Sequence, residues 1–187
     1  MSPSSIAPMR SPSLRLVVKT VFATLGVLAL LGLIGGYALL RSGLYNVSAT
    51  SQHFQFVYTL LEEGMHHSVR FHARDVDVPD LTDKTMIARG ALLYQAHCVQ
   101  CHGAPGVAPN GIGMSMQPLP GPLVDAPSKW QSNEVYWIVR HGIKMSGMPA
   151  WEYRLQDEQL WEIVAFMQQL PQLTPAQYAA SVREPQP

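Results

Sequence analysis

The longest apolar run in the chain lies near its N-terminus. Residues 20–40 are 21 positions without a charged side chain. A helix rises about 1.5 Å per residue, so this run is about 30 Å long, which matches the apolar thickness of a bilayer. The pattern predicts one membrane-spanning helix over residues 20–40.

Beyond this run the apolar positions recur at the spacing of amphipathic helices. Residues 53–73 place Phe54, Leu61 and Val69 on one such pattern. This helix has three candidate positions: on the bilayer, against the following domain, or against another subunit. The next helix is expected to begin near Thr82 or Asp83, which are both good N-cap residues, and to continue to position 98.

Two more helices are predicted towards the C-terminus. Residues 133–141 form a short helical pattern that ends at Gly142, and residues 157–170 form an amphipathic one that Pro171 ends. No alternating pattern of the kind typical of strands appears, so the predicted fold class is all-α. Residues 103–127 are expected to be a loop with five Gly and six Pro. So long a loop in a small domain suggests that a bound group fills the core.

The distribution of charged residues predicts the orientation of the membrane helix. The 187 residues hold 13 basic and 13 acidic side chains, and the balance argues against a nucleic-acid-binding surface. Residues 1–40 contain three basic residues and no acid, so the positive-inside rule places 1–19 in the cytoplasm and 41–187 outside. A signal peptide cleaved at Val47-Ser48-Ala49 is the alternative, but the apolar part of a signal is only about 7–15 residues long.

The candidate chemistry lies in the motif Cys98-Val99-Gln100-Cys101-His102. The spacing C-x-x-C-H is the signature of covalent c-type haem attachment. Two thiols on one helical turn can reach the vinyl groups at one porphyrin edge, and the adjacent His102 can offer its imidazole to the iron. A haem would also fill the core and order the loop rich in Gly and Pro.

Three other interpretations of the two cysteines are weaker. A thioredoxin-type pair follows a strand and begins a helix, whereas this motif ends a helix. A zinc site needs four ligands, and no second pair of ligands accompanies Cys98 and Cys101. A plain disulfide between these two residues would leave the long loop unexplained.

A methionine is expected as the second axial ligand of the iron. Met145 and Met148 lie in a segment where Gly147 and Pro149 disfavour a regular helix. Spacing alone leaves both open, and Met114 and Met116 in the long loop are weaker candidates. The remaining histidines are expected to be solvated or structural rather than ligands: His53, His66, His67, His72, His97 and His141.

Three features in the same order carry a resemblance to a known family. CVQCH (98–102), HGIKMSGMPAW (141–151) and the helix over 157–170 resemble the small mono-haem class I cytochromes c of bacteria, over about residues 82–171. The segment 43–47 and the helix after it resemble a membrane-anchored subgroup.

The resemblance implies a small cytochrome c fold of three or more helices around one covalent haem c. Cys98 and Cys101 would hold the haem, and His102 and Met148 would be the axial ligands of its iron. The first helix of the domain would cross the last one through three residues, and an indole would support the haem carboxylates. The matching positions are Gly90, Tyr94 and Trp161 for the crossing, and Trp130 or Trp151 for the carboxylates.

The expected protein is an electron carrier, not an enzyme, tethered to the bacterial cytoplasmic membrane by a single pass. Its redox partners would be a membrane-bound dehydrogenase, a quinol oxidoreductase or a terminal oxidase on the periplasmic side. Two alternatives stay open: a haem sensor or peroxidase-like protein with an open sixth iron position, and a haem-carrying structural subunit of a larger membrane oxidoreductase. The expected parts are a cytoplasmic leader (1–19), the anchor (20–40), a periplasmic linker with an amphipathic helix (41–80), the cytochrome c domain (81–173) and a loose tail (174–187).

Overall fold

The computed structural model describes residues 13–183, which form helices joined by turns and loops, with no β-strand among them. The chain divides into two compact units, Met1–Ser48 and Ala49–Pro187. All the predicted chemistry lies in the second unit. The prediction of an all-α fold is confirmed.

The described part of the first unit is dominated by helix α1, Leu14–Ser42. It has no buried residue, and it is long and apolar enough to cross a membrane. The helix extends beyond the predicted 20–40 at both ends, because Lys19 and Arg41 at its flanks are themselves good helix formers. Residues 1–12 of the expected leader lie outside the described residues.

Helix α2, Gln55–Ala73, is part of the second unit rather than of a separate linker. It packs on α7, Ser132–His141, and buries Val69 and Ala73. The side-chain amide of Asn133 donates to the carbonyl of Ala73 at 2.9 Å. Of the three candidate positions for this helix, the structure shows the one against the following domain, and the compact unit begins at Ala49 instead of residue 81.

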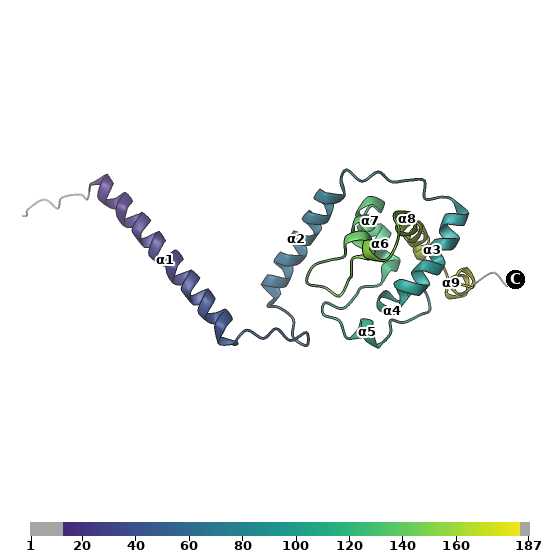
Figure 1. Ribbon diagram of the computed structural model, residues 1–187, viewed down its shortest axis with the longest axis horizontal. Helices are drawn as coiled ribbons and strands as arrows, with labels where there is room; N and C mark the ends of the chain where they lie inside the picture. The colour runs from purple at the N-terminus through teal and green to yellow at the C-terminus, as the bar shows by residue number, and fades with distance from the viewer. Residues whose placement is uncertain (1–12, 184–187) are drawn as a thin grey trace, which may run out of the picture. The chain divides into compact units, whose positions relative to one another are not determined.

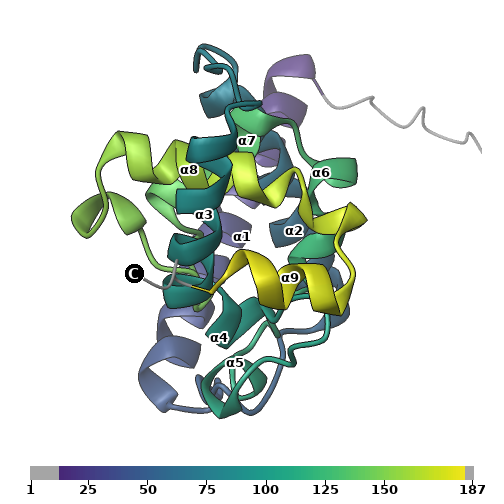
Figure 2. The same cartoon turned by 90° about the vertical axis from the view of Figure 1, so that its right-hand side faces the viewer.

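The core of the second unit is the crossing of α3, Lys84–His97, over α8, Asp157–Met167 (Figure 2). Helix α3 begins where predicted, because the Asp83 carboxylate accepts from the backbone N–H of Met86 at 2.7 Å. At the crossing, a Cβ added to Gly90 would overlap the backbone carbonyl oxygen of Glu162. Gly90 therefore lets the two helices come into backbone contact.

The aromatic contacts of this crossing correct the expectation for Trp161. The ring of Tyr94 lies 5.5 Å from that of Phe166, whereas Trp161 stacks on Tyr136 of α7 at 4.0 Å. Positions 161 and 166 are five residues apart, which places them about 140° apart around a helix of 3.6 residues per turn. Phe166 therefore faces α3, and Trp161 faces α7.

The C-terminal segment is ordered by a helix that the sequence pattern did not indicate. Helix α8 ends at Met167, a 3₁₀ turn (η3, Leu170–Gln172) contains Pro171, and α9 covers Pro175–Ser181. Thr174 and Gln177 form a capping box at the start of α9. Tyr178 is buried and its hydroxyl donates to Oε1 of Gln95 at 2.6 Å. The expectation of a loose tail is wrong for residues 174–183; residues 184–187 lie outside the described part.

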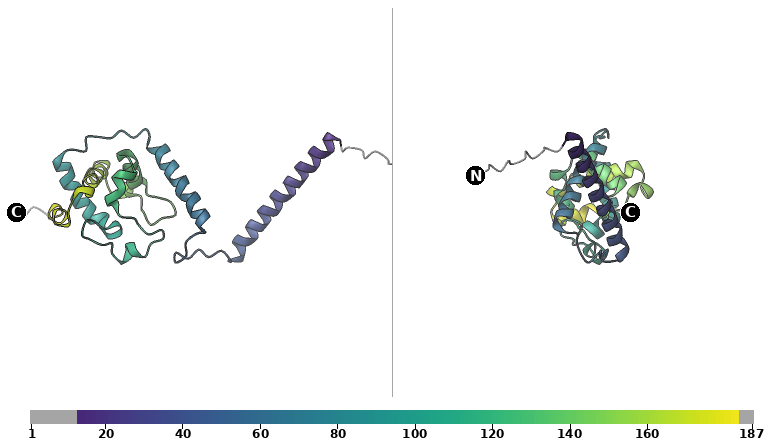
Figure 3. Two further views of the ribbon diagram at one scale, coloured as in Figure 1. Left: turned by 180° about the vertical axis from the view of Figure 1, so that it is seen from behind. Right: turned by 90° about the vertical axis from the view of Figure 1, so that its left-hand side faces the viewer.

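The segment rich in Gly and Pro is not a featureless loop. It contains three short helical turns: α5 (Gly111–Met114), η1 (Leu123–Asp125) and α6 (Ala126–Lys129). The segment lies between α2 and α3 in views from the front and from behind (Figures 1 and 3). Asn110 fixes its middle, because its backbone N–H donates to the carbonyl of Gln100 at 2.9 Å and its side chain caps α5.

Candidate functional site

A cavity of about 520 Å³ lies inside the second unit. It is enclosed by the segment rich in Gly and Pro (residues 103–127, called the long segment below) and by the helices around it. This volume is within the range of about 300–1,000 Å³ that is usual for small-molecule sites. All four residues predicted for the haem site line this cavity: Cys98, Cys101, His102 and Met148.

The end of α3 places the two cysteines. The backbone N–H of Cys98 donates to the carbonyl of Tyr94 at 2.9 Å, and a short helix, α4 (Val99–His102), follows at once. Both thiols are free, and Cys98 is buried while Cys101 is half-buried. Burial raises the pKa of the Cys98 thiol to about 12. Cys98 therefore presents a protonated thiol, and both cysteines line the same cavity.

A hydrogen bond from the long segment orients His102. Nδ1 of His102 lies 2.8 Å from the carbonyl oxygen of Gly121. A carbonyl only accepts, so Nδ1 carries the proton and Nε2 keeps its lone pair. Burial lowers the pKa of His102, although the bond to Gly121 opposes this effect. The result is a neutral imidazole, which is the form that binds a metal.

The residue after His102 is also held in place. The hydroxyl of Tyr94 donates to the carbonyl of Gly103 at 2.8 Å. Gly103 has a φ of +66°, a conformation that favours glycine. The chain therefore turns sharply behind His102 and leaves its ring against the cavity.

Met148 and Met145, the two candidates that spacing leaves open, have different environments. Met148 is half-buried, lines the cavity and packs on the hydrophobic core. Met145 sits at the tip of the loop with a φ of +59° and is 70% exposed. The backbone N–H of Met148 donates to Oγ of Ser146 at 3.1 Å, which helps to fix the turn.

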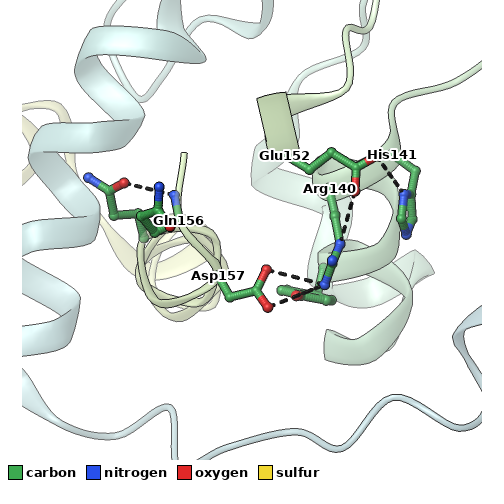
Figure 4. Close-up of polar contacts among 7 residues, drawn as sticks. Arg140, His141, Glu152, Gln156 and Asp157 are labelled. Carbon is green, nitrogen blue, oxygen red and sulfur yellow. Dashed lines mark hydrogen bonds and ion pairs between the residues drawn. The ribbon is translucent and has the colours of Figure 1, made fainter. Parts of the chain in front are cut away.

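Ion pairs join the two ends of the loop that carries Met148 (Figure 4). Nε of Arg140, at the end of α7, lies 3.3 Å from the carboxylate of Glu152 in the 3₁₀ turn η2, Trp151–Tyr153. Nη1 of Arg140 lies 3.2 Å from Asp157 at the start of α8, and His141 also contacts Glu152 at 3.3 Å. We call this group the Arg140 clamp. It ties the segments before and after Met148 to each other.

Other methionines also reach the cavity. Met116, which was a weaker candidate, lines it and packs closely on Gly147. Met65 and Met167 line it from α2 and α8, whereas Met114 is 60% exposed. Met116 is therefore a stronger alternative to Met148 than Met145 is, as a candidate for the second axial ligand.

One histidine expected at the surface, His97, lines the cavity, and another, His66, packs against a residue that lines it. His97 is half-buried, lines the cavity and has its ring 5.0 Å from that of Trp151. The ring of His66 stacks on Trp130 with centroids 4.5 Å apart and planes 8° apart. Trp130, which also lines the cavity, lies far from His66 in the sequence. Only tertiary packing brings these rings together, so no sequence pattern marked them.

The other histidines are peripheral. His53, His67, His72 and His141 are exposed. His67 pairs with Glu63 at 3.0 Å, and His72 stacks on Trp137 at 5.7 Å. In the part of the chain that the structure describes, no group of three or more His, Cys, Asp or Glu side chains comes together in a way that could hold a metal ion.

The donor set and the cavity fit a haem. Two thiols three positions apart, a neutral imidazole and a thioether meet at one cavity whose remaining lining is largely apolar, including Leu123, Val139 and Ile143. A porphyrin needs such an apolar enclosure, and these side chains are the usual covalent and axial ligands of haem c.

Comparison with known proteins points to the same chemistry. Residues 85–167 match the model of the family described as cytochrome c oxidase, cbb3-type, subunit III. No curated protein matches the chain. The matched region runs from the start of α3 to the end of α8, so it contains the cysteine motif, Met148 and the helix crossing. The chain thus has one long apolar helix followed by a c-type cytochrome domain, with α1, α2 and α9 outside the matched residues.

Proposed function

We propose that this chain is a membrane-anchored cytochrome that carries one covalent haem c and transfers single electrons. The observation that carries the proposal is the convergence of Cys98, Cys101, His102 and Met148 on one cavity within the family-matched residues. Haem supplies one-electron chemistry when it is bound. The protein provides attachment, axial ligands and an apolar enclosure.

The cysteine motif would attach and coordinate the haem from one side. Cys98 and Cys101 would hold the haem through thioether bonds to its vinyl groups, and Nε2 of His102 would bind the iron. The Gly121 carbonyl keeps the proton on Nδ1, which leaves the lone pair of Nε2 for the metal. Since a hydrogen-bonded imidazole is also a better electron donor, Gly121 supports the strength of this ligand.

Met148 would be the second axial ligand. It lines the cavity on a loop whose turn is fixed by hydrogen bonds and whose ends are joined by the Arg140 clamp. A methionine with a histidine raises the reduction potential of a haem. If His102 and Met148 both bind the iron, no position would remain open for a substrate, which favours an electron carrier over an enzyme or a sensor.

The anchor and the charge pattern support a periplasmic location. Helix α1 can span a bilayer, and the basic residues Arg10, Arg15 and Lys19 precede its apolar centre. The domain would then face the periplasm of a bacterium and meet redox partners at the membrane: a dehydrogenase, a quinol oxidoreductase or a terminal oxidase. The description of the matched family favours the terminal oxidase.

Haem staining after denaturing electrophoresis tests this proposal. The protein is expressed with a haem-attachment system, and the thioether bonds should keep haem on the unfolded chain. The double variant Cys98→Ser, Cys101→Ser should lose the stain, whereas Ser115→Ala, on an exposed part of the same long segment, should keep it. Wild-type protein that carries no covalent haem would refute the proposal.

A further inference from the structure

Helix α2 has apolar side chains on two sides, and the domain covers only one of them. The helix forms one edge of the second unit (Figure 1), where it packs on α7 and buries Val69. Its first two turns expose other large apolar side chains: Phe56 is 76% exposed, Leu60 60% and Leu61 43%. Phe54, the N-cap residue of the helix, is 81% exposed. We call these four residues, 54, 56, 60 and 61, the α2 patch.

The α2 patch points away from the side of the helix that packs on the domain. Leu60 and Val69 are nine positions apart, which places them about 180° apart around a helix of 3.6 residues per turn. Phe56 lies one turn before Leu60 on the same face and about 140° from Val69. Apolar residues gathered on one exposed face mark an interaction site, whereas single exposed ones do not.

The charge pattern around the α2 patch suits lipid. Between Thr20 and Leu61, the only residue of the charged types Asp, Glu, Lys and Arg is Arg41, at the end of the anchor. Acidic residues return at Glu62, directly after the patch. The uncharged stretch therefore connects the membrane helix to the patch without offering ionic groups to a charged protein surface.

The covalent chain keeps the α2 patch close to the bilayer. The compact second unit begins at Ala49, so six residues, 43–48, separate it from the end of α1. An extended chain advances at most about 3.6 Å per residue, so Ala49 stays within about 25 Å of Ser42. Helix α2 is the first helix after this link, and the patch occupies the turns that are nearest to the anchor along the chain. This position favours the lipid surface over any other occupant.

We infer that the α2 patch inserts into the surface of the bilayer that α1 spans. A helix at such a surface buries its apolar side chains about 5–10 Å deep and leaves its polar side chains in water. Phe56 and Leu60 enter the lipid, while Glu63 and His67, which pair at 3.0 Å, stay at its aqueous edge. The inference rests on the membrane anchoring in the proposed function and does not depend on the haem.

This contact brings the haem cavity to the membrane surface. Met65 lines the cavity and lies four residues after Leu61, about 6 Å further along the helix. A patch held among the lipid headgroups therefore holds one wall of the cavity beside them, where a redox partner embedded in the bilayer can reach it. Because α2 lies outside the family-matched residues, this device is an addition of this chain to the matched domain.

A spin label on the α2 patch tests the contact. The full-length protein is first loaded with haem, which occupies Cys98 and Cys101, and a nitroxide is then attached to the variant Phe56→Cys. In vesicles of uncharged phosphatidylcholine, oxygen dissolved in the lipid should reach this label. A water-soluble nickel chelate should reach it several-fold less than it reaches a label on Tyr153→Cys, an equally exposed aromatic position outside the patch. Adding Leu60→Asp should return the Phe56→Cys label to water, because a carboxylate resists burial in lipid.

Every other result contradicts the inference. Equal access of the nickel chelate to both labels would overturn it and leave a partner protein as the occupant of the patch. A label shielded from both oxygen and the chelate would overturn it in favour of a second copy of this chain. A mature chain without residues 20–40 would overturn the anchor, and the inference with it. Absence of covalent haem would refute only the haem part of the proposed function, and the same labels could then be placed on a chain with Cys98→Ser and Cys101→Ser.

Discussion

Nδ1 of His102 lies 2.8 Å from the carbonyl oxygen of Gly121, a residue 19 positions further along the chain. This contact joins the cysteine motif to the middle of the segment that is rich in Gly and Pro. A carbonyl is free to accept here because Gly121 lies between Pro120 and Pro122, outside any helix. The long segment therefore serves a purpose at the site, since it selects the tautomer of the proposed iron ligand.

The axial ligand can be identified by three methionine variants. Met148→Ala should lower the reduction potential, remove the absorption band of the methionine–iron bond and let the reduced haem bind carbon monoxide, because the iron loses its sixth ligand. Met145→Ala should change none of these, since that side chain is 70% exposed. Met116→Ala is the more stringent control, because Met116 lines the same cavity as Met148.

The results of this series also test the carrier function. If Met116→Ala produces the three changes and Met148→Ala does not, the ligand assignment is wrong and the carrier function stands. If reduced wild-type protein already binds carbon monoxide readily, the sixth position is open. A sensor or peroxidase-like protein would then be the better interpretation.

The Arg140 clamp should stabilise the Met148 loop more than the whole domain. Glu152→Gln weakens two contacts of partly exposed side chains, so the global stability should change little. The methionine–iron band should nevertheless disappear at a lower denaturant concentration than the helical circular dichroism signal. Glu158→Gln, on an exposed position of α8, is the matched control. Coincident transitions in Glu152→Gln would show that the clamp does not act on the loop.

Gly90 should tolerate no side chain. In Gly90→Ala the added Cβ would overlap the carbonyl oxygen of Glu162, a backbone atom that cannot rotate away. The free energy of unfolding should fall by about 3 kcal/mol, at the upper end for overpacking. Gly64→Ala, in α2 with nothing within 4 Å of the new Cβ, should instead gain up to about 1 kcal/mol from helix propensity. Thermal unfolding of both variants gives the comparison, and equal effects would contradict the packing argument.

Helix α9 should contribute to the stability of the cytochrome domain. Tyr178→Ala removes a ring that is 1% exposed and packs near Tyr94 and Phe166, so unfolding should become easier by about 3–5 kcal/mol. Tyr178→Phe loses only the hydrogen bond to Gln95 and should lose about 1 kcal/mol. Tyr153→Ala, at an 81% exposed tyrosine, should change the stability by less than about 0.5 kcal/mol. If Tyr178→Ala left the free energy of unfolding unchanged, residues 174–183 would be a loose tail that does not stabilise the domain.

The anchor should remain on the mature protein. Mass spectrometry of the membrane-extracted chain should find residues 20–40 retained, because this apolar run is longer than that of a signal peptide. A reporter fused after the C-terminus should be active only outside the cytoplasm. Recovery of a soluble form that starts near Thr50 would show a cleaved signal instead.

Local features predicted much of the site. The C-x-x-C-H spacing is confined to five consecutive residues, so their order alone brings both thiols and the imidazole to one turn. The start of α3 was equally local, since Asp83 caps the helix with its own side chain. Contacts between residues far apart in the chain could not be predicted from a local pattern. Examples are the stacking of His66 on Trp130 and the burial of Tyr178.

The long apolar helix, the helical class and the cysteine motif can be read from the order of the residues, because each depends on the periodicity or spacing of neighbouring positions. Packing had to be seen before α2 and α9 could be assigned to the domain, Phe166 rather than Trp161 could be paired with Tyr94, and Met148 rather than Met145 could be placed at the cavity. Burial is a property of the packed molecule, so neighbouring positions do not encode it. Met145 and Met148 are three positions apart in the loop between α7 and α8. The packing of this loop decides which of the two side chains lines the cavity.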